Sequence, residues 1–283
     1  MSPKNSSSQS QAGAIARRDY FNDPFSEFGD AASQVPSKLP VVKIEYLASE
    51  STQREHLDWQ EGKFSINIGE QLDKLVVALI GLRYGRILWP EDFDPKNPDK
   101  EPLCRSDNGL TPSGGLECPK TDVKARVGGD QIPVCMHFDE SGKPVRSQTG
   151  RYVPACPFAQ WGAKNEAPPC KEFFTLLLWE HTLNIPLIYI VKGTGIKHIS
   201  QLRMDMMRFQ RELPEDIALP PAAYCQIHVT TRKVQRWYEP QFQVAGKFSD
   251  IEAEINADAM QDIRPTFESM TADDFEFNGK SEE

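Results

Sequence analysis

Cysteines are the residues whose type and number most clearly allow chemistry in this sequence. Five of the six lie within residues 103–171: Cys104, Cys118, Cys135, Cys156 and Cys170. This stretch is rich in Gly, Pro, Ser and Asp and has little apolar periodicity, so it cannot become ordered by burying apolar surface. Thiolates around a bound Zn²⁺ would order it. We therefore expect residues 103–171 to form a zinc-binding insert with a structural metal.

The spacing of the cysteines leaves the ligand set open. Thirteen residues separate Cys104 from Cys118, and thirteen separate Cys156 from Cys170, which is wider than the spacing of common zinc fingers. We take these four as the first choice of ligands, with Cys135 as the alternative to Cys118. A catalytic zinc is less favoured, because the sequence has neither an HExxH motif nor a deaminase signature.

Basic and aromatic side chains interleave at several places along the chain. Proteins that bind single strands combine cations for the phosphates with aromatic rings on which bases stack. We expect a binding surface for single-stranded DNA that is formed by the insert and by the strand before it. Its candidate residues are Arg83, Tyr84, Arg86, Trp89, Arg105, Phe158, Trp161 and Lys164. Further clusters of the same kind occur at 151–152 and 232–238.

The elements that must position these residues are mostly strands. Alternating or continuous apolar runs predict strands, and Ile199, Leu202, Met206, Phe209 and Leu213 recur at helical spacing. The order of these elements is typical of a mainly β fold with one packed helix, an OB-like β-barrel with the zinc insert between its second and third strands. The predicted strands lie at residues 41–46, 64–68, 75–89, 185–191, 224–230 and 238–244.

Charge divides the chain into three parts. The net charge is −9, and residues 246–283 carry eleven acidic and three basic side chains, whereas residues 40–245 are nearly neutral. We expect a disordered lead at 1–40, the barrel domain at 41–245 and a disordered acidic tail at 246–283. No apolar run is long enough to cross a membrane, and no secretory signal is present, so we expect a cytoplasmic protein with reduced thiols.

The remaining motifs do not favour catalysis. The sequence has no Walker loop, no GxGxxG and no GxSxG, and its histidines are isolated. We therefore expect a protein that is not an enzyme and has no catalytic residues.

Several runs resemble a group of phage and mobile-element proteins. They are residues 79–89, 103–109, 156–162, 185–187 and 192–197. The group resembles single-stranded DNA-binding proteins with a zinc-ribbon insert, and its relatives tend to have a cysteine where this chain has Tyr152, Val153 and Pro154. The resemblance implies a role in replication or recombination in a bacterial host cell. It also implies that the acidic tail, through residues 273–277, recruits replication or recombination proteins.

The leading hypothesis is thus a single-stranded DNA-binding protein with little sequence preference. The first alternative is a zinc-stabilised protein-interaction module that modulates a polymerase or a host enzyme. The second alternative is a metal-dependent nuclease, because the carboxylates of nuclease sites can be scattered along a sequence.

Overall fold

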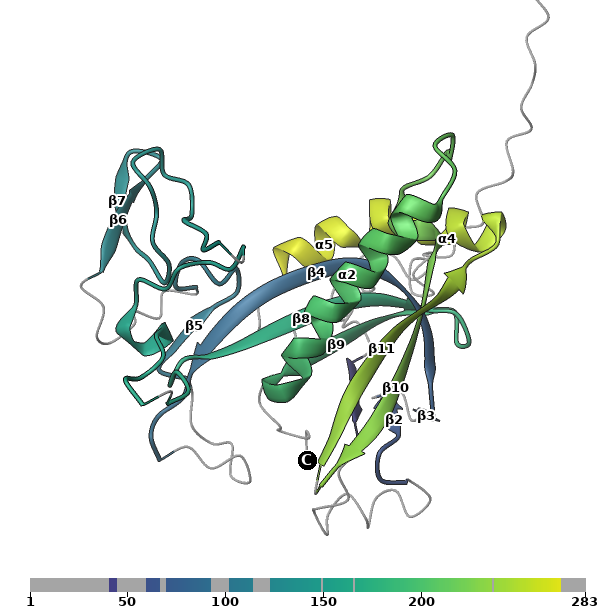
Figure 1. Cartoon of the computed structure of the whole chain (residues 1–283), viewed down its shortest axis with the longest axis horizontal. Coiled ribbons are helices and arrows are strands. Elements are labelled where there is room, and N and C mark those ends of the chain that lie inside the picture. The colour runs from purple at the N-terminus through teal and green to yellow at the C-terminus, as the bar shows by residue number, and fades with distance from the viewer. Residues whose placement is uncertain are drawn as a thin grey trace, which may run out of the picture. The chain divides into compact units, whose positions relative to one another are not determined.

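The structure of this protein is a computed structural model, shown in Figure 1. It describes residues 41–44, 60–66, 70–92, 102–113, 123–148, 150–164, 166–235 and 237–270. The chain divides into two units, residues 1–38 and 39–283, and all described residues belong to the second. The predicted disordered lead, Cys118 and the acidic residues 273–277 lie outside the described residues.

A nine-stranded sheet forms the main element of the described chain. All its neighbouring strands are antiparallel except β1 and β9. The strand order is β11 (Trp237–Lys247), β10 (Cys225–Val234), β4 (Leu75–Leu88), β8 (Lys171–Glu180), β9 (Ile185–Lys192), β1 (Val41–Ile44), β2 (Phe64–Ile66) and β3 (Glu70–Leu72), with β5 (Cys104–Ser106) paired to the far end of β4. The prediction of a mainly β protein is confirmed.

The described strands form no closed barrel, because β11 and β3 are the two edges of an open sheet. The predicted OB-like barrel is therefore not confirmed, and the described strands show an open sheet in its place. The physical reason is that helices cover both faces of the sheet. A sheet that buries each face against helices does not have to close on itself to hide apolar surface.

Strand β4 contributes to both layers of this core. Leu75 and Val77 pack with Ile199 and Leu202 of helix α2 (Ile196–Glu212) on one face. Ala78 and Ile80 pack on the other face against two C-terminal helices. A strand that is buried on both faces has apolar residues at successive positions rather than at alternate ones, which explains the continuous apolar run 75–80.

Two glycines in β4 allow its irregular path. The register with β8 shifts between Leu79 and Gly81, which marks a β-bulge. At Gly85, a Cβ atom would lie 2.2 Å from the ring of Phe173, so a side chain there would displace that ring. The sequence predicts a bulge or a close approach at these glycines, and both are found.

The predicted helix is confirmed as α2. Ile199 and Leu202 are buried, and Met206 and Phe209 pack against the same core. The helix follows a 3₁₀ turn, η3 (Gly193–Gly195), and its N-cap residue is Gly195.

The acidic C-terminal segment differs from the predicted disordered tail. Helices α4 (Asp250–Asp262) and α5 (Arg264–Ser269) lie on the sheet face opposite α2, where Ala259 and Phe267 are buried (Figure 1). A capping box starts α4: the Glu252 amide donates to Ser249 Oγ at 3.3 Å, and the Ser249 amide donates to Glu252 Oε2 at 2.8 Å. Apolar side chains at about every fourth position pack these two helices against the sheet, although the segment is acidic.

Residues 102–171 form what we call the cysteine module. It connects β4 to β8 and contains β5, the hairpin β6 (Lys124–Val127) and β7 (Asp130–Pro133), and the short helix η2 (Pro157–Ala159). A further short helix, α3 (Pro221–Tyr224), precedes β10. No described helix is long and apolar enough to cross a membrane.

Candidate nucleic-acid interface

A groove of about 1050 Å³ is bounded by β4, β8, α2 and the cysteine module. Strand β4 contributes its residues 82, 84 and 86, and helix α2 contributes residues along its length from 196 to 210. The module supplies the polar wall. Its lining residues include Arg146, Gly150, Arg151, Tyr152, Pro154, Ala159 and Trp161.

Strand alternation decides which basic residues of β4 reach the groove. Tyr84 and Arg86 line it, whereas Arg83 points to the opposite face. There Arg83 Nη1 donates to the carbonyl oxygens of Phe267, at 3.1 Å, and of Met270. Arg83, one of the candidate DNA-binding residues, therefore lies outside this groove and fastens α5 to the sheet.

Arg86 lies in the groove wall but is only 3% exposed. Its Nη2 is 2.5 Å from Glu172 Oε1, and its Nε donates to the Tyr84 hydroxyl at 2.8 Å. Burial raises the pKa of Tyr84 well above its ordinary value, so this hydroxyl stays protonated. Glu172 also pairs with Arg151, whose Nη2 lies 3.7 Å from Oε2. This network braces the wall, and the Arg86 charge is compensated within it.

The exposed arginine and tryptophan side chains of the groove come from the module and from α2. Trp161 is 65% exposed. Arg146 stacks over Tyr152, with its Cζ 4.2 Å from the ring centroid, and donates to the Tyr152 hydroxyl at 2.8 Å. Arg203 of α2 is exposed at the helix surface. The exposed side chains of Arg146, Arg151, Arg203 and Trp161 thus face one groove.

Exposed apolar side chains lie in the same groove. Leu82 of β4 and Met204 and Met207 of α2 are 49%, 50% and 41% exposed. Methionine side chains adapt to irregular partners because they are unbranched and flexible. This part of the groove therefore suits flat apolar groups such as base faces or apolar peptide side chains.

Charge in the groove is opposite in sign to that of the whole protein. The described lining residues include four arginines, Arg86, Arg146, Arg151 and Arg203, and one carboxylate, Glu172. Their formal charge is +3, on a protein of net charge −9. A concave surface with such a local excess attracts anions.

The other predicted binding residues lie outside this groove. Arg105 is 6% exposed and its Nε is 3.2 Å from Asp107 Oδ1, so it is held inside the module. Phe158 packs against Cys104 and Cys170. Trp89 is half-buried and Lys164 is exposed, and neither lines the groove.

A second, very small cavity in the module is lined by four cysteines: Cys104, Cys135, Cys156 and Cys170. All four are buried and none forms a disulfide. The Cys135 carbonyl accepts hydrogen bonds from the Ala155 and Cys156 amides at 3.0 and 3.1 Å. As placed, no group of three or more His, Cys, Asp or Glu side chains in the described residues is arranged to hold a metal ion.

Cys225 is separate from this group. It lies on β10 in the core between the sheet and α2, and burial raises the pKa of its thiol to about 12. Of the predicted metal ligands, the structure thus brings three of the first-choice set to one cavity together with the alternative, Cys135.

Sequence reasoning did not select Arg146, Tyr152 or Arg203 as site residues. The pair 151–152 carried a local signal, since an arginine precedes a tyrosine there. Arg203 carried no comparable signal in the sequence; in the structure it is exposed on α2, next to the exposed apolar residue Met204. Their meeting in one groove depends on how α2 lies across the sheet, which is a long-range property.

Comparison with known proteins identifies no relative, so the site is interpreted from its geometry alone. No protein-family model, no curated protein and no solved structure matches the chain.

Proposed function

We propose that this protein binds single-stranded DNA in the groove between β4, β8, α2 and the cysteine module. The observation that carries the proposal is the composition of this groove. Exposed arginines and an exposed tryptophan share one concave surface whose formal charge is +3 on a protein of charge −9. Phosphates pair with arginines, and bases stack on aromatic rings, which is how single strands are bound without sequence preference.

The exposed residues have separate tasks in this proposal. Arg146, Arg151 and Arg203 meet backbone phosphates, Trp161 stacks on a base, and Leu82, Met204 and Met207 contact neighbouring base faces. Arg86 does not contact DNA, because its charge is used by Glu172. The role in phage or mobile-element replication or recombination, with partners recruited by the acidic residues 273–277, rests on the resemblance in sequence.

A structural Zn²⁺ in the cysteine module belongs to the same proposal. The proposal rests on the type of donor, since thiolates are common zinc ligands: four buried thiols line one cavity of about 10 Å³, in a module with little apolar core of its own. We propose Cys104, Cys135, Cys156 and Cys170 as ligands, which replaces Cys118 of the first choice by Cys135. A bound Zn²⁺ would fasten the chain segments that carry Arg146, Tyr152 and Trp161 to the groove.

The protein-interaction alternative is favoured by one observation, the exposed apolar residues Leu82, Met204 and Met207. The nuclease alternative receives less support. Metal-dependent phosphodiester cleavage uses several carboxylates around the ions, and Glu172 is the one carboxylate among the described lining residues.

The proposal is tested by fluorescence anisotropy with a labelled oligo-dT at several salt concentrations. Three phosphate contacts predict that log K falls against log salt with a slope of about −2. Replacing Arg203 with Gln removes one contact and makes the slope shallower by about 0.7.

Arg208→Gln is the matched control, because Arg208 is exposed on the same helix, pairs with Asp205 and lies outside the groove lining. It should leave the slope unchanged. Absence of binding at low salt, together with tight binding of an apolar peptide, would favour the interaction module instead.

A further inference from the structure

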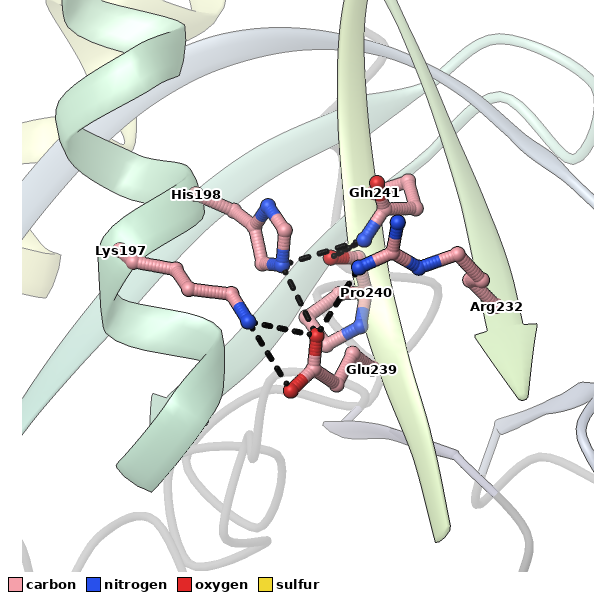
Figure 2. Close-up of polar contacts among 6 residues, drawn as sticks. All are labelled: Lys197, His198, Arg232, Glu239, Pro240 and Gln241. Atoms are coloured by element: carbon pink, nitrogen blue, oxygen red, sulfur yellow. Dashed lines mark hydrogen bonds and ion pairs between the residues drawn. The ribbon is translucent and has the colours of Figure 1, made fainter. Parts of the chain in front are cut away.

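A buried carboxylate lies beside the N-terminal end of α2, as Figure 2 shows. Glu239 of β11 is 2% exposed. Lys197 Nζ lies 3.2 and 2.9 Å from its two oxygens, His198 Nε2 lies 3.2 Å from Oε2, and Arg232 Nη2 lies 3.5 Å from Oε2. Gln241 Nε2 lies 3.1 Å from the same imidazole nitrogen, His198 Nε2.

The cluster carries more positive charge than the single carboxylate of Glu239 can neutralise. The hydrogen bond from Lys197 lowers the pKa of Glu239 to about 2, so Glu239 is ionised at neutral pH. Lys197 and Arg232 then leave one uncompensated positive charge, without counting His198. Both side chains are more than half exposed, at 56% and 57%. Glu239 therefore holds two cations close together at the surface of the protein.

The strand hairpin around this cluster is also basic. Residues 225–247 contain Arg232, Lys233, Arg236 and Lys247 and a single acidic residue, Glu239. Lys233 is 57% exposed and pairs distantly with Glu61, at 3.7 Å. Trp237 is 37% exposed. This part of the chain repeats the combination of cations and an exposed ring that the groove has.

The cluster is next to the groove. Ile196 lines the groove at the start of α2, and Lys197 is the following residue of the same helix. α2 packs against β11, so Arg232 and Glu239 lie beside that end of the helix. A strand of nucleic acid that leaves the groove past Ile196 would meet these cations next.

We infer that the β10–β11 hairpin and the start of α2 form a second contact region for the phosphate backbone of the same DNA strand. Lys197, Arg232 and Lys233 bind phosphates, and Trp237 offers a ring to a base. Glu239 is a positioning residue that holds Lys197 and Arg232 in place. The inference rests on the proposed function, because it extends the path of the DNA beyond the groove.

The test compares oligo-dT lengths from about 4 to about 20 nucleotides, which brackets known single-strand site sizes. The wild-type chain should bind long oligonucleotides more tightly than short ones. Arg232→Gln with Lys233→Gln should remove most of this gain and reduce the salt slope for long oligonucleotides by about 1.4, since two phosphate contacts are lost. Affinity for the shortest oligonucleotide that fills the groove should stay unchanged.

Arg208→Gln with Arg264→Gln is the matched control. It removes the same charge from exposed ion pairs outside both regions, at 69% and 54% exposure, and should keep the gain with length. If the first double variant unfolds at a lower temperature than the wild type, Lys233→Gln alone repeats the test without touching Glu239.

The outcomes separate the two proposals. If no oligonucleotide binds, the proposed function fails and this inference fails with it. If short oligonucleotides bind, and the hairpin variant keeps the full gain with length as the control does, the groove stands and the second contact region is wrong. A wild-type chain that shows no gain with length would also overturn the inference.

Discussion

Trp161→Ala tests most directly whether DNA bases stack in the groove. The side chain is 65% exposed, so its removal takes little apolar surface out of the core and should leave the unfolding temperature unchanged. Stacking of a base on an aromatic side chain contributes about 1 to 3 kcal/mol. Since about 1.4 kcal/mol corresponds to a tenfold change in Kd, the variant should bind oligo-dT about 5-fold to about 140-fold more weakly.

The assay is an anisotropy titration of wild type, Trp161→Ala and Trp161→Phe with one short labelled oligo-dT. Trp161→Phe keeps a ring for stacking and should recover most of the lost affinity. Circular dichroism melts of the three proteins check that each is folded. If the wild type binds and Trp161→Ala binds within about twofold of it, no base stacks on Trp161, and the assignment of this residue is refuted.

Three further predictions concern the metal, the buried carboxylate and the C-terminal end. Elemental analysis should find one zinc per chain, lost in Cys135→Ser with a lower unfolding temperature but kept in the control Cys225→Ser. A fully folded, metal-free protein would contradict the zinc site. The pKa of Glu239 is lowered from 4.5 to about 2, so its stabilising effect is complete above about pH 4.5 and disappears as the pH falls to about 2. The unfolding free energy of wild type should exceed that of Glu239→Gln by about 1 to 3 kcal/mol near neutral pH, because water screens its exposed partners, and thermal melts across this pH range should show the difference shrinking. Deletion of residues 271–283, which carry five acidic side chains and one basic one, should tighten DNA binding at low salt, and an unchanged Kd would count against competition by this segment.

Local patterns in the sequence predicted individual elements well. The apolar run of β4, its glycines and the helical spacing of Ile199 and Leu202 depend on neighbours a few residues away, and the structure contains all of them. The capping box of Ser249 and Glu252 was also a local signal. It marked the start of α4, but the high acidic charge of the segment led to a prediction of disorder there.

Strand alternation should have separated the candidate DNA-binding residues of β4 onto two faces. Arg83 and Tyr84 are adjacent in a strand, so their side chains point to opposite faces of the sheet. Tyr84 reaches the groove and Arg83 reaches α5. The strand order and the position of α2 across the sheet were beyond local reasoning, because they depend on contacts between distant segments. The groove wall built from Arg146, Tyr152 and Arg203 could not be predicted for the same reason.

The central claim is that single-stranded DNA lies in the groove. The most direct measurement is photo-crosslinking of the wild-type chain with an oligonucleotide that carries 5-iododeoxyuridine, followed by mapping of the attached peptides by mass spectrometry. We predict attachment at Trp161 and Tyr152 and none on α4 or α5, which cover the opposite face of the sheet. Crosslinks confined to α4 and α5, or none at a DNA concentration that saturates binding, would contradict the account.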